Sequence, residues 1–408
     1  MDFKAELYKR LDRYARIDTQ SDDKSTTFPT TSKQFDLLNL LVEELKQIGA
    51  KNVSIDKWGY VMASIPANVE GKPAIGFLSH VDTSPDASGT NVRPKIHKAW
   101  NGGDIEIGCG LVLNTKNCPE LANCMGEDIV TASGDTLLGA DDKAGIAIIM
   151  TAAEYIIKHP EIRHGEIKIG FTPDEEVGQG VDHFDVSKFG ADYAYTFDGD
   201  MAGCIEMENF NAHALTIKIE GKSVHPGTAK NSMANAIRMA GDIISSWPEN
   251  MLPESTEGHE GFIMFTDLVA EIEKAEIKGI VREHDSRKLL AMEKQLEAIV
   301  AAKKLKYPAA KIELSFREQY RNMIEIIDKN PQVMENLKKA VSMAGLEPRI
   351  KPVRGGTDGA RLSFMGLPCP NIFTGGFNYH GRYEWVSLDG MNKAAQVMLN
   401  LAQVWSED

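Results

Sequence analysis

The stretch EIKIGFTPDEEVG, residues 166–178, sets a short apolar run directly before two adjacent glutamates, Glu175 and Glu176. The run 166–172 has the length and composition of a buried strand, so we expect the glutamates just beyond the end of that strand. Carboxylates this close repel each other and raise one another's pKa. Either a solvated turn or a bound cation has to compensate for their charge.

Further strands and helices alternate around this stretch. The apolar runs 74–79, 191–197 and 370–374 predict strands, and the patterns 30–50, 143–159 and 388–405 predict helices. In the first of these helices the apolar residues recur at helical spacing, and Gly49 stands where the helix should stop. The alternation predicts an α/β fold in which helices cover a sheet.

The middle of the chain has a different pattern. Alternating strands are expected over 212–221, 275–284 and 310–316, and helices over 228–247 and 286–305, with Thr228 as the N-cap of the first helix. This is a two-layer α+β pattern. We therefore expect a discontinuous first domain, residues 1–208 and 320–408, that carries an inserted domain, residues 209–319.

Length, charge and cysteine content narrow the class of protein. A chain of 408 residues is long enough for two domains. The net charge of −14 argues against a nucleic acid or an anionic membrane as partner. Five scattered cysteines without a CxxC pair indicate free thiols, and the role of Cys109, Cys118 and Cys124 is open. No secretory signal or membrane span is recognisable, so we expect a cytoplasmic protein.

Polar side chains follow the predicted strands at the points where these strands end. In open α/β sheets the functional sites form outside the carboxyl ends of the strands, so these side chains should meet at one edge of the sheet. An adjacent pair of aspartates also stands just before the helix expected from residue 143. Besides the two glutamates, the residues concerned are His80, Asp82, Asp141, Asp142, Asp198 and His380.

Such a group of carboxylates needs cations. Each residue alone is more typical of a solvated turn, a helix cap or a structural histidine, but their coincidence favours a metal site. Mixed histidine and carboxylate ligands suit zinc, with manganese or cobalt as alternatives. The ligands exceed one tetrahedral site, so two ions that share a carboxylate, ~3.5–4 Å apart, fit better.

Seven motifs carry a resemblance to a known family. They are SHVDTSPD (79–86), LLGADDKAG (137–145), FTPDEEVG (171–178), YTFDGD (195–200), SVHPGTAK (223–230), RGGTDGA (354–360) and GGFNYHGRYEWV (375–386). They resemble the co-catalytic zinc exopeptidases of the aminopeptidase/carboxypeptidase/deacylase clan, and within it the tripeptide aminopeptidases. The resemblance implies a zinc-exopeptidase-like catalytic domain with a central mixed, mostly parallel sheet, and an inserted α+β lid domain.

The resemblance also implies a role for each residue of the site. His80 and Asp198 would bind one zinc ion, Glu176 and His380 the other, and Asp141 would bridge them, with Asp142 only a neighbour. Asp82 would orient the ring of His80, and Glu175 would be the general base that acts on a metal-activated water. Adjacent side chains on an extended backbone point to different sides, so we expect Glu175 and Glu176 to lie on an extended backbone and to point apart.

The substrate contacts implied by the resemblance lie further along the chain. His225 would reach the oxyanion, Arg354 would hold a substrate carboxylate, and Asn322 and Arg282 would make further contacts. The implied substrates are tripeptides, from which the N-terminal amino acid is released. The inserted domain would close over the substrate, and a homodimer through this domain is left open.

Two other kinds of protein remain as alternatives. The same scaffold serves dipeptidases, carboxypeptidases and N-acyl amino acid deacylases, in which the metal ligands would be nearly the same. A metal- or peptide-binding protein without catalysis would have a substituted base, and the presence of Glu175 argues against it.

Overall fold

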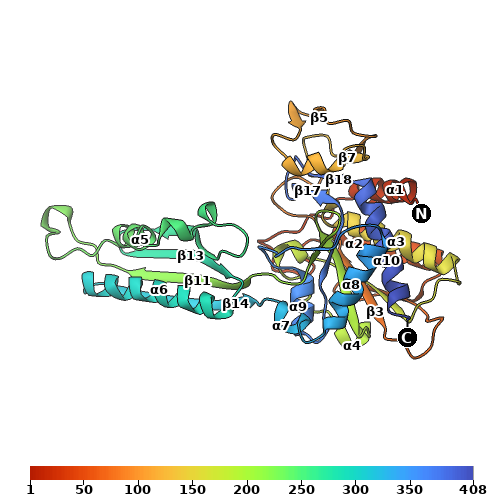
Figure 1. The fold of residues 1–408 in the computed structure, drawn as a ribbon. Coiled ribbons are helices and arrows are strands. Elements are labelled where there is room, and N and C mark those ends of the chain that lie inside the picture. The colour runs from red at the N-terminus through yellow and green to blue at the C-terminus, as the bar shows by residue number, and fades with distance from the viewer. Residues whose placement is uncertain (408) are drawn as a thin grey trace. The chain divides into compact units, whose positions relative to one another are not determined.

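The computed structural model describes residues 1–407, which divide into two compact units (Figure 1). The first unit consists of Met1–Met207, Met323–Lys351 and the described residues from Thr357 onward. The second unit consists of Glu208–Asn322 and Pro352–Gly356. It contains the segment that we expected to be inserted, 209–319, and also the later segment Pro352–Gly356, with which the chain returns to this unit.

The first unit is built around a mixed sheet. Its four central neighbours, β8, β3, β9 and β16, are parallel, and antiparallel or short strands lie on both sides. The prediction of a mixed sheet in an α/β fold is therefore confirmed. In spatial order the strands are β1 (Lys51–Ile55), β2 (Val61–Ile65), β8 (Ile167–Thr172), β3 (Ile75–His80), β9 (Tyr193–Gly199), β16 (Asn371–Phe373), β10 (Cys204–Glu206) and β15 (Arg349–Ile350).

Both faces of this sheet are covered, which explains why its strands are continuous apolar runs rather than alternating ones. Phe77 of β3 packs into the larger core with most of the helices, whereas its neighbour Leu78 packs into a smaller core on the opposite face. The larger core includes α1 (Lys4–Ala15), α2 (Gln34–Ile48), α3 (Ala140–Lys158), α7 (Ile324–Ile327), α8 (Pro331–Met343) and α10 (Leu388–Val404). The smaller core includes α4 (Val186–Phe189) and α9 (Asp358–Phe364).

Helix α3 is the most buried of the long helices, because apolar residues occupy almost all of its circumference. It contains Asp141 and Asp142 in its first turn and packs against β3 and β9. Within residues 1–407 no helix combines the length and the apolar character needed to cross a membrane.

A small satellite sheet extends the first unit. It pairs β4 (Lys95–His97), β7 (Ile129–Thr131), β17 (Gly376–Phe377) and β18 (Trp385–Ser387), next to a hairpin of β5 (Ile105–Gly108) and β6 (Leu111–Leu113). Cys118 and Cys124, in and beside the 3-10 helix Pro119–Cys124, are buried in the core of this region, and the Trp385 indole N–H donates to the Cys118 sulfur at 3.2 Å. Cys109 is exposed. Cys118 and Cys124 therefore have packing partners of their own.

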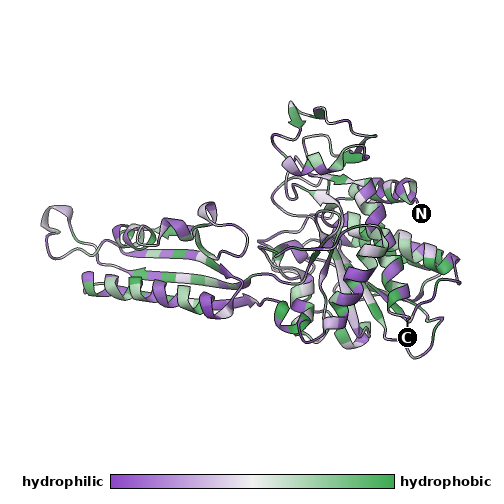
Figure 2. Ribbon diagram, in the orientation of Figure 1, coloured by the Kyte–Doolittle hydropathy of each residue, from purple (hydrophilic) through white to green (hydrophobic). Residues whose placement is uncertain are grey.

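The second unit is a two-layer α+β structure. Its antiparallel sheet has the order β12 (Phe262–Ala270), β13 (Lys274–Glu283), β11 (Asn211–Glu220) and β14 (Lys311–Tyr320). Apolar residues alternate with polar ones along β11 and β13 (Figure 2), and the apolar face packs against α5 (Ala236–Ile244) and α6 (Ser286–Lys306). The expected start of α5 at Thr228 is wrong. Helix α5 begins at Ala236, where the Asn235 side chain accepts from the Arg238 backbone N–H.

Candidate metal centre

The predicted ligands meet at one edge of the main sheet, because parallel strands end there side by side. His80 is the last residue of β3, Asp198 is the last but one of β9, and Glu176 lies in the short turn after β8. Asp141 stands in the first turn of α3, and His380 comes from the loop between β17 and β18. All five residues belong to the first unit.

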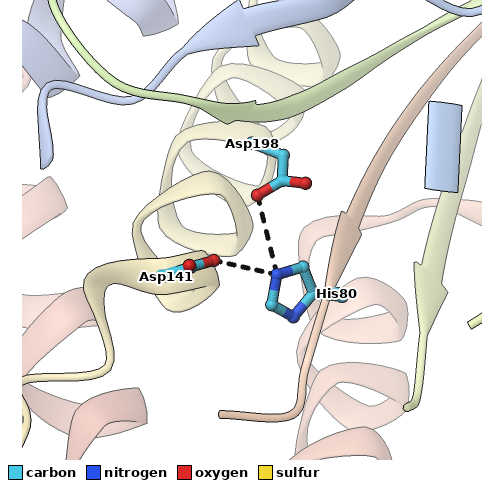
Figure 3. Close-up of side chains that lie close together, drawn as sticks. All are labelled: His80, Asp141 and Asp198. Carbon is cyan, nitrogen blue, oxygen red and sulfur yellow. Dashed lines mark hydrogen bonds and ion pairs between the residues drawn. The ribbon is translucent and has the colours of Figure 1, made fainter. Parts of the chain in front are cut away.

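One group of ligand atoms forms around His80 (Figure 3). The Nε2 atom of His80 lies 2.9 Å from Oδ1 of Asp141 and 3.6 Å from Oδ1 of Asp198. His80 is only 3% exposed, so its ring direction is set by packing as well as by these contacts. The three side chains converge on one point from two strand ends and a helix start.

A second group forms around His380 and shares one member with the first. The Nε2 atom of His380 lies 2.8 Å from Oε2 of Glu176 and 3.3 Å from Oδ2 of Asp141. Asp141 therefore turns one carboxylate oxygen to each histidine. Within each group of three, the ligand atoms all lie within 4.8 Å of one another.

The electrostatics of the cluster call for positive charge. Burial raises the pKa of Asp198, and burial together with Asp141 raises the pKa of Glu176. Burial would also raise the pKa of Asp141, but hydrogen bonds with His380 and His80 hold it below its ordinary value. Hydrogen bonds with Asp141 and Glu176 in turn raise the pKa of His380 to about 11. The positive charge of protonated His380 thus offsets the negative charge of the neighbouring carboxylates, as a bound cation would.

The residues fit a pair of divalent ions. Imidazole nitrogens and carboxylate oxygens are the donors that zinc, manganese and cobalt accept. The second carboxylate oxygen of Glu176, Oε1, is buried and makes no hydrogen bond, and such an oxygen is normally satisfied. An ion in the second group would satisfy it, and Asp141 is placed to serve both ions.

Asp82 connects the histidine strand to the glutamate turn. Its carboxylate accepts the backbone N–H of Glu175 at 3.0 Å and that of Glu176 at 3.2 Å. The Nδ1 atom of His80 lies 3.3 Å from the Asp82 carboxylate and 3.1 Å from the Asp82 carbonyl oxygen. Asp82 therefore contacts the imidazole, as expected, and also holds the turn that carries both glutamates.

The expectation that Glu175 and Glu176 lie on an extended backbone is wrong. They form a 3-10 turn, Glu175–Val177, between Asp174 at φ 58° and Gly178 at φ 71°. At these two left-handed residues the chain turns after Pro173. The directions of the two glutamate side chains are therefore set by a turn of the backbone and not by the alternation of side chains along a strand. Burial, and next the nearby Asp198, raise the pKa of Glu175 well above its ordinary value.

The helix start at Asp141 is held by Glu384, whose role the sequence analysis did not assign. The Glu384 carboxylate, 2% exposed, accepts the backbone N–H groups of Leu138, Gly139 and Asp141 at 2.6–3.0 Å. The Asp142 carboxylate accepts from the Ser79 hydroxyl, the Gly145 N–H and the His80 backbone N–H. That Asp142 is only a neighbour of the metal ligands stays a prediction. The only sequence signal for Glu384 is its four-residue spacing from His380.

The four expected substrate contacts, His225, Arg354, Asn322 and Arg282, all belong to the second unit. The Arg354 guanidinium donates to the carbonyl oxygens of Gly258, Glu260 and Thr256. Its position thus depends on the loop 256–260, and its role in substrate binding stays a prediction.

The other three candidates differ in exposure. Asn322 is 2% exposed and its side-chain oxygen accepts the Asn209 N–H. Arg282 donates to the Val281 carbonyl, and His225 is exposed and accepts from the Gly227 N–H. These residues are not among the metal-binding groups, and their contact with substrate is untested.

Comparison with known proteins places the chain in a family. Residues 138–404 match the model of Peptidase family M20/M25/M40. The chain is 48% identical over 402 residues to Peptidase T of Clostridium perfringens, which covers 98% of this chain and 99% of that protein. Among solved structures, a tripeptidase from Staphylococcus aureus is similar with a TM-score of 0.79 at 20% identity, covering 99% of both chains. A dinuclear metal-binding peptidase of the M20 family from Bacillus subtilis is similar with a TM-score of 0.68 at 14% identity, covering 98% of both chains.

Proposed function

This chain belongs to peptidase family M20/M25/M40, and on that premise we propose that it hydrolyses the first peptide bond of tripeptides and releases the N-terminal amino acid. The observation that carries the proposal is that the Asp141 carboxylate contacts His80 through one oxygen and His380 through the other. The extensive identity to Peptidase T supports the substrate class, as does the fold shared with a structure described as a tripeptidase.

We infer that the centre holds two ions, of which zinc is the first choice. His80, Asp141 and Asp198 would hold one, and Asp141, Glu176 and His380 the other. Bound there, such ions act as Lewis acids on the peptide carbonyl and lower the pKa of a water towards ~7. The donor set also accommodates manganese or cobalt, and metal analysis of the purified protein distinguishes these.

Glu175 is the general base in this proposal. It shares its turn with Glu176, so its carboxylate is carried to the centre by the same backbone that carries a ligand. A raised pKa brings a carboxylate closer to the working pH, where proton transfer in both directions is efficient. Glu175 would take a proton from the attacking water and return it to the departing amine.

The second unit supplies the remaining assignments. We propose that Arg354 binds the substrate carboxylate, because a guanidinium offers paired donors to a planar anion. His225 is assigned to the oxyanion, and Asn322 and Arg282 to further substrate contacts. Closure of this unit over substrate and pairing with a second copy of the chain both stay predictions.

Two measurements test the proposal. An unblocked tripeptide should be cleaved at its first bond, and its N-acetylated form should not be; preference for the acetylated peptide would instead indicate a deacylase or a carboxypeptidase. Chelation should abolish turnover and added Zn²⁺ should restore it.

Substitution of the base gives the sharper test. Glu175→Gln should lower kcat by about 10²–10⁴-fold, the range for loss of a general base, while the ions stay bound. Glu70→Gln, the same substitution at an exposed glutamate, is the matched control. A Glu175→Gln protein that cleaves tripeptide at the unmodified rate would show that another group is the base.

A further inference from the structure

A strap from the N-terminal region, residues 21–34, runs between two loops of the metal centre. At its first end the Ser21 backbone N–H donates to the carbonyl oxygen of Thr83, the residue after Asp82, at 3.1 Å. At its other end Thr30 and Gln34 bind Asp174, the residue before Glu175. The strap lies before residue 138, where the match to the family model begins.

Four hydrogen bonds tie Asp174 to the strap. The Thr30 backbone N–H donates to Oδ2 of Asp174 at 2.7 Å, and the Thr30 hydroxyl donates to Oδ1. The Gln34 side-chain amide donates to Oδ1 at 2.7 Å, and its carbonyl oxygen accepts the Asp174 backbone N–H at 3.2 Å. Asp174 has no exposed surface, so these bonds form away from competing water.

The backbone of Asp174 explains what the bonds accomplish. Its φ of 58° lies in the left-handed region, which is costly for residues other than glycine and persists only when the surroundings enforce it. This reversal turns the chain from β8 into the 3-10 turn, so that the N–H groups of Glu175 and Glu176 face Asp82. The turn is therefore fixed from one side by the strap and from the other by Asp82.

The strap has an anchor that does not involve Asp174. Phe28 packs edge-on against His183, with ring centroids 4.8 Å apart, and against Trp58 at 6.0 Å. Loss of one hydroxyl at Thr30 should therefore leave the strap in place. Such a change removes the bond to Asp174 and, within the strap, the acceptor of the Asp22 backbone N–H.

We propose that Asp174, held by Thr30 and Gln34, is a positioning residue that aims Glu175 at the reacting water and Glu176 at its metal ion. The effect on Glu175 rests on the proposed hydrolysis, whereas the effect on Glu176 rests only on the proposed metal centre. Asp174 touches neither substrate nor ion in this assignment. It acts through the direction of the turn that follows it.

Two variants weaken the hold in different ways. Thr30→Val keeps the shape of the side chain and removes its hydroxyl donor. Asparagine at position 174 also tolerates the left-handed region. In Asp174→Asn, however, an amide NH₂ group replaces one carboxylate oxygen and faces a hydrogen-bond donor that the oxygen accepted from. Thr30→Ser restores the hydroxyl, and Thr26→Val makes the same substitution at an exposed position of the strap.

The test uses the full chain, stripped of metal and titrated with Zn²⁺ by calorimetry, followed by tripeptide kinetics at saturating Zn²⁺. Thr30→Val and Asp174→Asn should bind the weaker Zn²⁺ ion about 10–100-fold less tightly, as disturbed supports of metal ligands do. At saturating Zn²⁺ their kcat should fall about tenfold or more, with KM within twofold, because a small misplacement of a catalytic group can cost up to ~10²-fold in rate. Thr30→Ser and Thr26→Val should match the unmodified chain in both measurements.

Each other outcome is informative. Unchanged Zn²⁺ affinity and kcat in folded Thr30→Val and Asp174→Asn overturn the proposal, and so does a change confined to KM. If Asp174→Asn does not fold, Thr30→Val decides alone, because its packing volume is conserved. If the unmodified chain cleaves no tripeptide but the weaker Zn²⁺ ion is lost from Thr30→Val, the proposed hydrolysis fails and the positioning of Glu176 as a ligand stands.

Discussion

Substitution of Asp82 by asparagine tests whether the glutamate turn is held by charge. The Asp82 carboxylate accepts two backbone N–H groups, those of Glu175 at 3.0 Å and Glu176 at 3.2 Å. Hydrogen bonds to a charged group contribute about 1.5–3 kcal/mol each. Asparagine keeps one acceptor oxygen and turns an NH₂ group towards the other N–H, so about 2–3 kcal/mol should be lost. The His80 ring keeps its shorter contact, with the backbone carbonyl of residue 82, and only its 3.3 Å contact with the carboxylate changes, so the loss should act mainly through the turn.

If the whole of that free energy is lost from the stabilisation of the transition state, kcat/KM should fall about 30- to 150-fold. The assay is tripeptide hydrolysis at saturating Zn²⁺, with bound metal measured on the same samples. Asp23→Asn, at an exposed position, is the matched control. If Asp82→Asn keeps its ions and turns over within threefold of the unmodified chain, the turn does not depend on the carboxylate charge, and the reasoning is refuted.

Three further changes have expected outcomes. Burial raises the pKa of Glu206 to about 8, against ~4.3 unfolded, so the stability that the protonated form contributes is fully present below pH ~4 and is lost as the pH rises through 8. Urea unfolding at pH 5 and pH 8 should therefore show up to ~3–4 kcal/mol of this pH dependence in the unmodified chain and lose it in Glu206→Gln. Glu384→Gln cannot accept all three N–H groups around Asp141 and should weaken Zn²⁺ binding about 10–100-fold by calorimetry, whereas unchanged binding would show that the helix start holds itself. A Cβ at Gly180 would lie 2.1 Å from the Asp358 carboxylate, so Gly180→Ala should cost about 1–3 kcal/mol in urea unfolding, unless Asp358 can move aside.

The strands and helices of the first unit were largely predictable, because burial on both faces leaves a plain record in the sequence. Strand β3 was expected over 74–79 and spans Ile75–His80, and α2 ends at Gly49, whose φ is 97°. The same apolar runs located His80, Asp198 and Glu176 at strand ends. The convergence of these side chains followed from that placement, since strands that run in parallel bring their ends together.

Features that depend on backbone N–H directions were not predictable. Glu384 and Asp174 act through hydrogen bonds with backbone groups far away in the sequence, and no periodicity records such partners. The start of α5 was placed at Thr228 because Thr is a good cap, but the structure caps the helix with Asn235, also a residue type that caps well. The satellite sheet was missed because strands of two or three residues carry no pattern.

The second unit draws its last piece, Pro352–Gly356, from a point thirty residues beyond the end of its main segment. Val353 pairs with Asn209, and Arg354 bonds to the loop 256–260. During synthesis, therefore, the chain must have been made as far as residue 356 before this unit can fold completely. A fragment cut at Asn322 would leave those carbonyl groups without their guanidinium, so a fragment that keeps all of the unit's bonds has to run on to residue 356.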